Sequence, residues 1–278
     1  VSLVPEGEGV TLGLPYLGFY ADWEQAPLFD DVPDGDYYIS PTRLVGASTD
    51  YIGGNYLGMG FGGTYDYSKL AFSADYNGEG NRALALIPGL RRNATSLNLS
   101  VLDPAGSVMW ESSYDRVPKN YFNTNSGGIT LLAVWEGWDG CLTDGTYAPE
   151  GPGYIYRLTG SVGQSQAKQT MDIPFFLDNT APKATDFTLM EEDGRYLLEF
   201  LVQDNHYVNY IQLGDSTSQE RLAAVGDGFG EITEPGALTR VSIDITNYGD
   251  LCAKKGLNPA RITVYTTDYA GNTSMNYV

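Results

Sequence analysis

The sequence is poor in histidine and in positive charge, and each shortage narrows the possible functions. Its 278 residues include one histidine, His206, so a catalytic triad would have a single candidate base. The chain has 16 Lys and Arg residues and 35 Asp and Glu residues, which gives a net charge of −19. We therefore expect no nucleic-acid partner, because no basic patch could offset phosphate repulsion. An apolar run of about 18 residues is also missing, so no membrane insertion is expected.

Cysteine is scarce as well. Cys141 and Cys252 are the two cysteines, and they lie far apart in sequence. A disulfide would require their Cα atoms to lie within roughly 7 Å. We expect two unpaired thiols. No secretory leader precedes Val1, and the numbering begins on a β-rich segment, so we expect a mature fragment or an excised segment.

Turn residues and alternating strands make up most of the chain. There are 34 Gly, 14 Pro and 21 Tyr, and aromatic residues favour strands. The stretch Val134 to Leu158 shows the pattern, because Asp-Gly and Pro-Glu-Gly turns precede an alternation of Tyr154, Tyr156 and Leu158 with other residues. We interpret this stretch as turns that lead into a half-buried strand.

Further strands are expected where apolar residues alternate between turn clusters. These ranges are Ser96–Asp103, Arg195–Asp204, Tyr207–Gly214, Leu238–Ile245 and Ala260–Asp268. Helix signals are weak, and one short helical turn is expected between Asn247 and Pro259, with Asp250 as its cap and Gly256 as its stop. The fold class is therefore all-β, as tandem immunoglobulin or fibronectin-type-III-like β-sandwiches.

Composition changes divide the chain into three parts. Residues 1–36 are expected to hold the trailing strands of a preceding fibronectin-like domain and an acidic connector. Residues 37–180 would form a β-sandwich with insertions, and residues 181–278 another fibronectin-like β-sandwich. The hinge between them lies in Leu177–Asp186, where Pro182 disfavours helix and Asp178 favours a turn.

Several stretches together resemble one family, the cell-envelope subtilisin-like proteinases that include lactocepin and the streptococcal complement-cleaving peptidase. The stretches occur in the family's order and resemble the fibronectin-type-III-like domains that follow its catalytic domain. They are Leu12–Trp23, Tyr76–Leu84, Leu90–Val108, Val134–Val162, Pro174–Ala184, Val202–Leu213 and Thr266–Ser274.

The resemblance implies a non-catalytic extracellular segment of a serine protease, secreted or cell-wall-associated on a Gram-positive bacterium. Such a segment would act as a stalk or spacer and could offer an exosite that positions a protein substrate. Its partners would be the parent protease domain and that substrate, and we expect a monomer. The alternative is a surface adhesin or a carbohydrate-binding module.

Residues for catalysis are not evident. The family's signatures around Asp, His and Ser are absent, as is Gly-x-Ser-x-Gly, and no pair of carboxylates stands out. His206 is interpreted as a turn residue between two strands. We expect no catalytic site and no cofactor, apart from calcium.

Calcium is the candidate ligand, because oxygen side chains alternate around a glycine in one loop. The residues are Asp75, Asn77, Glu79 and Asn81, with Gly80 at the sixth position. The twelfth residue, Leu86, departs from the pattern because it cannot supply a carboxylate. A hydrogen-bonded glycine-rich turn is the alternative.

A second acidic cluster is interpreted as a solvated linker, with calcium as the alternative. It consists of Asp30, Asp31, Asp34 and Asp36.

Aromatic residues suggest two kinds of surface. The glycine-rich stretch Asn55–Tyr67 could be a loop with an exposed contact surface at Tyr56, Phe61 and Tyr65, or a glycine-bent strand pair. A second group is interpreted as core and hairpin packing, with a carbohydrate-stacking platform as the alternative. That group is Trp110, Tyr121, Phe122, Trp135 and Trp138.

Overall fold

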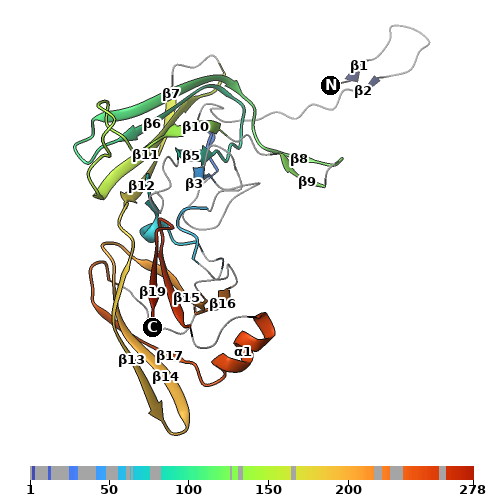
Figure 1. Ribbon diagram of the computed structural model, residues 1–278. Helices are drawn as coiled ribbons and strands as arrows, with labels where there is room; N and C mark the ends of the chain where they lie inside the picture. The colour runs from blue at the N-terminus through green and yellow to red at the C-terminus, as the bar shows by residue number, and fades with distance from the viewer. Residues whose placement is uncertain are drawn as a thin grey trace.

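The computed structural model describes part of the chain. The described ranges are 2–3, 12–13, 25–30, 42–47, 56–60, 63, 65–75, 83–125, 127–130, 134–163, 167–215, 221–225, 234–256 and 261–278. In Figure 1 most of these residues form two bodies that follow one another along the chain. We call the described residues from 25 to 177 the first unit, and those from 183 to 278 the second unit.

The first unit is built from two sheets. One has the strand order β10-β5-β3, with bounds Val134–Trp138, Ala83–Ile87 and Arg43–Ala47. The other has the order β4-β12-β11-β6-β7, with bounds Ala71–Phe72, Lys168–Leu177, Gly151–Ser161, Ala94–Leu102 and Val108–Val117. All of the pairs are antiparallel except β12 with β4. A short 3₁₀ helix, η1 (Tyr67–Lys69), precedes β4.

Two small hairpins complete the described N-terminal part. Strands β8 (Tyr121–Asn123) and β9 (Gly128–Thr130) form one, which extends away from the two sheets of the first unit in Figure 1. Strands β1 (Ser2–Leu3) and β2 (Leu12–Gly13) form the other.

The core of the first unit lies between its two sheets and is centred on Trp138. This side chain is 1% exposed. Its ring stacks against Tyr154 at 5.9 Å and meets Phe175 edge-on at 6.4 Å between centroids. On β11 the predicted alternation is confirmed, because Tyr154, Tyr156 and Leu158 are buried while Arg157 is not. A strand of period two thus supplies one face of this core.

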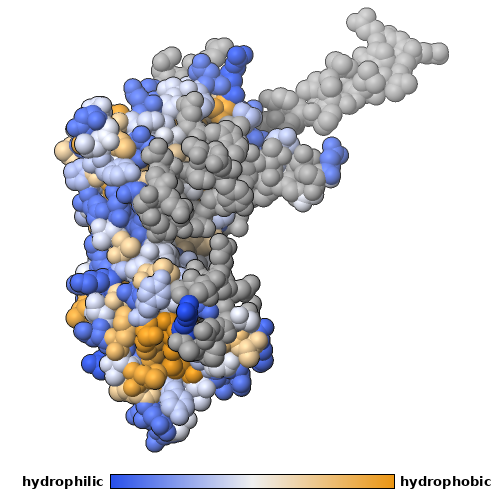
Figure 2. Space-filling view, viewed as in Figure 1, coloured by the Kyte–Doolittle hydropathy of each residue, from blue (hydrophilic) through white to orange (hydrophobic). Residues whose placement is uncertain are grey.

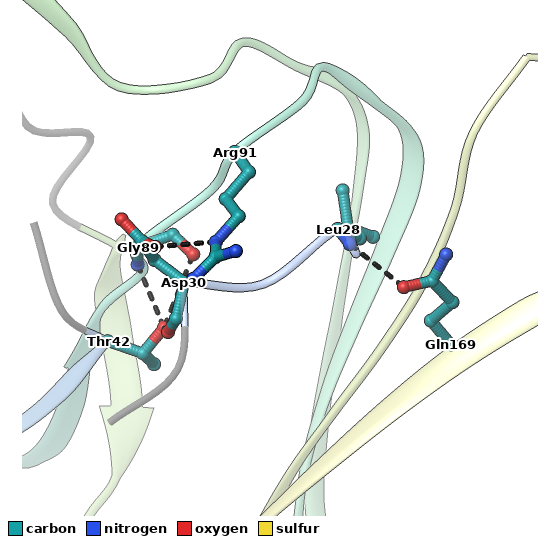
Figure 3. A network of polar contacts seen from close by, with 6 residues as sticks. All are labelled: Leu28, Asp30, Thr42, Gly89, Arg91 and Gln169. Atoms are coloured by element: carbon teal, nitrogen blue, oxygen red, sulfur yellow. Dashed lines mark hydrogen bonds and ion pairs between the residues drawn. The ribbon is translucent and has the colours of Figure 1, made fainter. Parts of the chain in front are cut away.

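The segment 25–30 joins the first unit through a buried polar network, shown in Figure 3. Leu28 and Phe29 belong to the first core. The Asp30 carboxylate accepts from Arg91 Nε at 2.7 Å, and Asp30 N donates to the Gly89 carbonyl at 2.7 Å. Thr42 Oγ1 donates toward the Asp30 and Gly89 carbonyls, at 3.2 and 3.3 Å, and accepts from Gly89 N at 3.0 Å.

This network corrects the interpretation of Asp30 as part of a solvated linker. Asp30 is 1% exposed and carries an ion pair, which is how a carboxylate tolerates burial. Asp31, Asp34 and Asp36 lie outside the described residues.

The second unit is also built from two sheets. The first has the order β13-β14-β17, with bounds Lys183–Glu192, Arg195–Gln203 and Thr239–Asp244. The second has the order β16-β15-β18-β19, with bounds Arg221–Val225, Val208–Gly214, Thr263–Asp268 and Thr273–Tyr277. Helix α1 (Tyr248–Lys255) follows β17.

A separate core fills the space between these sheets. It includes Phe200 from β14, Val241 from β17, Ile211 from β15 and Val264 from β18. Strand β18 is buried along its whole length. Because the two cores share no residue, each unit has its own hydrophobic centre.

Helix α1 differs in detail from the expected single turn. It runs for 8 residues, and its cap position is Asn247, which makes no side-chain capping bond, while Asp250 lies in the first turn. The prediction of Asp250 as the cap was wrong. Gly256 ends the helix as expected, since its φ of 67° is a conformation that favours glycine.

The all-β sandwich prediction is confirmed, as is that of two unpaired thiols at Cys141 and Cys252. The closer likeness to fibronectin or immunoglobulin domains, and the boundaries at residues 36 and 180, stay predictions. Over the described part of the chain, no helix has the length and apolar character needed to cross a membrane.

Candidate functional site

The two units meet at a junction where polar and aromatic side chains from both sides are in contact. The chain passes from β12 to β13 through residues 178–182, which have no regular structure. Phe176, near the end of β12, stacks on His206 of the second unit with 4.5 Å between ring centroids. Asn209 Nδ2 donates to the Met59 carbonyl at 3.2 Å, and Lys69 Nζ lies 5.6 Å from the Tyr207 ring centroid. The junction is therefore a packed contact.

Three buried aspartates lie at this junction, each at the end of a strand. Asp178 directly follows β12, Asp204 directly follows β14, and Asp268 is the last residue of β18. Their side chains are 0%, 5% and 1% exposed. One carboxylate oxygen from each lies within 4.8 Å of the other two. We call these three residues the junction acids.

Local turns explain how each junction acid is held. Asp178 Oδ1 accepts from Thr180 N at 3.1 Å, and Asp204 Oδ2 accepts from His206 N at 3.1 Å. Such bonds to the backbone two residues ahead are typical of aspartate in turns. In both residues the second oxygen, Asp178 Oδ2 or Asp204 Oδ1, is buried and has no hydrogen-bond partner among the described residues.

Asp268 is held by the turn between β18 and β19. Its Oδ1 accepts from Asn272 N and its Oδ2 from Asn272 Nδ2, both at 2.8 Å. Gly271 has φ 91°, a backbone conformation that side chains rarely adopt, and it allows the turn to close. Asn272 Nδ2 also donates to the Asp178 carbonyl at 2.9 Å. This one side chain therefore connects the turn of the second unit to the linker.

Burial raises the pKa of each junction acid, and the charges of neighbouring carboxylates raise it further. Burial, and then the charge of Asp204, raises the pKa of Asp178 to about 7. Burial raises the pKa of Asp204 to about 6, with a further contribution from Glu150. The pKa of Asp268 lies well above its ordinary value because of burial, followed by the charges of Asp178 and Asp204. Three ionised carboxylates are therefore costly here without a compensating positive charge.

Glu150 and Asn205 surround the cluster. Glu150 accepts from Asn179 N at 2.9 Å and from Thr180 Oγ1 at 2.9 Å. Asn205 Nδ2 donates to the same carboxylate at 3.1 Å. Glu150 therefore adds another negative charge beside the junction acids and connects the loop before β11 to both the linker and the second unit.

His206 occupies the predicted turn between β14 and β15, where it has a packing role. Its ring is stacked on Phe176 and meets Tyr207 edge-on at 4.7 Å. Burial lowers the pKa of His206 to about 4, so the imidazole is neutral at neutral pH. A neutral stacked ring contributes to the junction without adding charge.

The donor set of the cluster decides what it can bind. The junction acids present carboxylate oxygens, of which Asp178 Oδ2 and Asp204 Oδ1 have no partner in the described part of the chain. Carboxylate and amide oxygens are ligands for hard divalent cations, whereas zinc and copper prefer nitrogen and sulfur. The arrangement could therefore hold a hard cation.

Asp75, the first residue of the predicted calcium loop, lies next to the junction. Asp75 N donates to Asn179 Oδ1 at 3.3 Å, as does Ala74 N at 2.8 Å. Asn77, Glu79 and Asn81 lie outside the described residues. The calcium prediction at this loop stays a prediction.

Part of the predicted partner surface is in contact with the first unit. Tyr56 and Tyr65 are half-buried, and their ring centroids lie 4.8 and 5.3 Å from Arg43 Cζ. Burial raises the pKa of Tyr65 to about 12. Phe61 lies outside the described residues, so this surface stays a prediction. Figure 2 shows a largely polar exterior in which one apolar area stands out on the second unit.

The other aromatic group is divided between the core and the surface. Trp138 is in the first core and Trp110 packs against it, as the packing interpretation expects. Tyr121 is 50% exposed. Nothing is described of the side chains of Phe122 and Trp135.

Sequence reasoning missed the junction acids as a group, although each lies in a stretch that it singled out. Asp178 and Asp204 are each followed by Asn, and Asp268 precedes Asn272 in the next turn. The available signal was a strand that ends in an aspartate, repeated three times. Sequence spacing could not show that these three strand ends meet.

The chain is homologous to a segment of lactococcal cell-envelope proteinases. It is 25% identical over 291 residues to a PI-type proteinase of Lactococcus lactis subsp. cremoris, which covers 95% of this chain and 15% of that protein. The values are the same for a PII-type proteinase of Lacticaseibacillus paracasei. A PIII-type proteinase of Lactococcus lactis subsp. cremoris (strain SK11) is 29% identical over 187 residues, which is 63% of this chain and 10% of that protein. The chain thus spans about 15% of the first two relatives.

Other comparisons add little. No family model matches the chain. Among solved structures, bovine butyrophilin aligns with 86% of this chain and 98% of its own at 10% identity, with a TM-score of 0.29. The tetra-tandem repeat of a large adhesion protein aligns with 77% of this chain and 46% of its own, at 14% identity and a TM-score of 0.23. TM-scores this low do not show that this chain shares a fold with either structure.

Proposed function

We propose that this homologue of a cell-envelope proteinase segment is a structural spacer that sets the distance and direction between a catalytic domain and its anchor. In this proposal the bond-breaking residues belong to another part of a longer protein. The relatives are named as proteinases, and the match covers a small part of their length.

The observation that carries the proposal is the packed junction. A spacer transmits direction only if its units keep a fixed relation, and short linkers with large contacts limit domain motion. Here Phe176 and His206 stack, and Asn272 Nδ2 binds the linker carbonyl of Asp178. Glu150 from the first unit accepts from Asn205 of the second. These contacts support two units that act as one stiff element.

The partners and location follow from the same proposal. The chain would be extracellular, secreted or wall-associated, and its partners would be the parent catalytic domain and the protein substrate that it positions. The first unit would correspond to the domain proposed for residues 37–180, and the second to the domain proposed for residues 181–278.

Stiffness can be tested by small-angle X-ray scattering on the chain. The comparison is with a variant that carries six Gly-Ser residues inserted after Thr180, in the linker. The insertion should broaden the distance distribution and raise the radius of gyration, because the junction contacts can no longer hold both units. An unchanged profile would show that the units already move independently, which would remove the basis for a spacer.

The functional half of the proposal needs the longer parent protein. Deleting the segment that corresponds to residues 37–278 should leave cleavage of a short peptide nearly unchanged and alter cleavage of a large protein substrate. Loss of peptide cleavage, in a deletion protein whose catalytic domain is folded, would instead mean that the segment takes part in catalysis.

A further inference from the structure

We propose that the junction binds one calcium ion through the carboxylates of Asp178, Asp204 and Asp268. Such a site would tie the linker to two strand ends of the second unit. It is a property of the folded chain and stands whether or not the chain is a spacer.

The spacing of the junction acids suits calcium. Calcium lies about 2.3–2.6 Å from its oxygen ligands, so two ligands on opposite sides of the ion are about 5 Å apart. The three carboxylate oxygens lie within 4.8 Å of one another. An ion between them could approach all three oxygens at close to these distances.

Buried oxygens without partners also point to a missing ligand. Asp178 Oδ2 and Asp204 Oδ1 have no partner among the described residues, although the sister oxygen of each is held by a turn. Asn272 is 1% exposed, contacts the Asp268 carboxylate through Nδ2, and leaves Oδ1 buried and unpartnered. A buried polar atom without a partner is costly, and a bound ion removes that cost.

Charge balance also favours a cation when the acids are ionised. Each salt bridge found among the described residues lies elsewhere, at Asp30, Asp66, Asp172 or Glu199. The junction acids thus form a group of three buried carboxylates to which no described salt bridge extends. Native proteins pair buried charges or coordinate them to metals.

The identity of the ion follows from the ligands. The cluster offers oxygen only, which disfavours zinc and copper. Calcium accepts six to eight oxygens in flexible geometry, whereas magnesium demands a near-ideal octahedron and retains several waters. Calcium is therefore the better fit.

Calcium titration of the chelator-treated 278-residue chain tests the site, by calorimetry and by thermal unfolding. We expect one equivalent of calcium to bind, with a dissociation constant on the order of 1 mM or tighter, and the unfolding midpoint to rise with calcium concentration. Magnesium at the same concentration should raise the midpoint less.

A double variant, Asp178→Asn with Asp204→Asn, should bind calcium at least tenfold more weakly. It suits the test because each amide oxygen can still accept the turn bond while a neutral NH₂ replaces the unpartnered oxygen. Near-UV circular dichroism in calcium-free buffer checks that it is folded, and the single variant Asp204→Asn serves if it is not. Asp193→Asn is the matched control, because Asp193 is an exposed aspartate of the second unit.

Three outcomes would overturn the proposal. One is a wild-type chain that gives neither saturable binding nor a midpoint shift at 10 mM calcium, roughly ten times the weakest constant expected. Another is a double variant that binds as tightly as the wild type, above all if Glu79→Gln removes the binding instead. A third is magnesium that binds as well as calcium. Each of these results is independent of the scattering test, so the spacer proposal and the calcium-site proposal can be refuted separately.

Discussion

Two regions of this chain bury aspartate, and they neutralise its charge in different ways. In the first unit Asp30 is 1% exposed and accepts from Arg91 Nε at 2.7 Å. At the junction Asp178, Asp204 and Asp268 are buried to the same degree, and no salt bridge among the described residues reaches them. The same residue type thus has a counter-charge from the chain in one region and none among the described residues in the other.

The difference shows how a fold can depend on its surroundings. A buried carboxylate needs a positive partner or a proton, because isolated charge is costly in a low-dielectric interior. In the first region Arg91 supplies this positive partner to Asp30 from within the chain. The junction must instead take up protons, as the raised pKa values of its acids indicate, or a cation from solution. The stability of the junction should therefore respond to pH and to calcium.

The largest effect is expected from removing the counter-charge of Asp30. Arg91→Ala leaves a buried carboxylate without its ion pair, and it should lower the free energy of unfolding by about 2–3 kcal/mol. Urea denaturation measures this. In the double variant Arg91→Ala with Asp30→Asn, part of the loss should return, since the uncompensated charge is gone. A single variant that unfolds like the wild type would show that the Asp30 pair is unimportant.

At the junction, a substitution is expected to raise the free energy of unfolding instead of lowering it. In calcium-free buffer at pH 8, Asp204→Asn should raise the free energy of unfolding by roughly 1–2 kcal/mol, because it removes one of several repelling charges. In saturating calcium the same variant should be less stable than the wild type, because it lacks a ligand. Denaturation curves in both buffers test this reversal, and destabilisation of equal size in both would contradict it.

The pH dependence of stability should follow the junction acids. Their folded pKa values, about 7 for Asp178 and about 6 for Asp204, lie above the unfolded value near 3.9. Between about pH 4 and pH 7 the folded chain binds more protons than the unfolded chain, so stability falls as pH rises. His206, with its pKa lowered to about 4, acts in the opposite direction below about pH 6.5, but three acids outweigh one imidazole.

Calcium-free unfolding midpoints at pH 5 and pH 8 measure this effect. The midpoint should be higher at pH 5, and calcium at pH 8 should reduce the difference by holding the acids ionised. The double variant Asp178→Asn with Asp204→Asn distinguishes the effect of the junction acids from that of Glu150 and of the net charge of −19. The unfolding midpoint of this variant should change less between pH 5 and pH 8 than that of the wild type. A midpoint that rises between pH 5 and pH 8 would contradict the account.

The smallest effect is expected where an ion pair is exposed. Arg157 and Asp172 form a bidentate pair across β11 and β12, at 2.7 Å for each bond, with both side chains 39% exposed. Arg157→Ala should cost about 0.5 kcal/mol or less, because water already screens both charges. Comparing this loss with that of Arg91→Ala in the same urea series would show how much burial strengthens an ion pair. A loss as large as that of Arg91→Ala would show that burial is not what separates the two pairs.

The strands could be predicted because their patterns lie within a few residues. The junction could not, because it is formed by segments that are far apart in the sequence. Tyr154, Tyr156 and Leu158 reveal β11 because a strand exposes its period of two in a few residues. Asp178, Asp204 and Asp268 meet because β12 leads into the linker while β14 and β18, in different sheets, end at the same place. That meeting depends on topology, which the spacing of residues does not reveal. The same limit explains Asp30, whose partner Arg91 lies on a distant segment.

Calcium in the junction is tested most directly by diffraction from crystals of the 278-residue chain grown with calcium, measured at a long wavelength where calcium scatters anomalously. We predict one strong anomalous peak about 2.3–2.6 Å from carboxylate oxygens of Asp178, Asp204 and Asp268. An ordered junction with these three side chains in place and no anomalous peak between them would contradict the account.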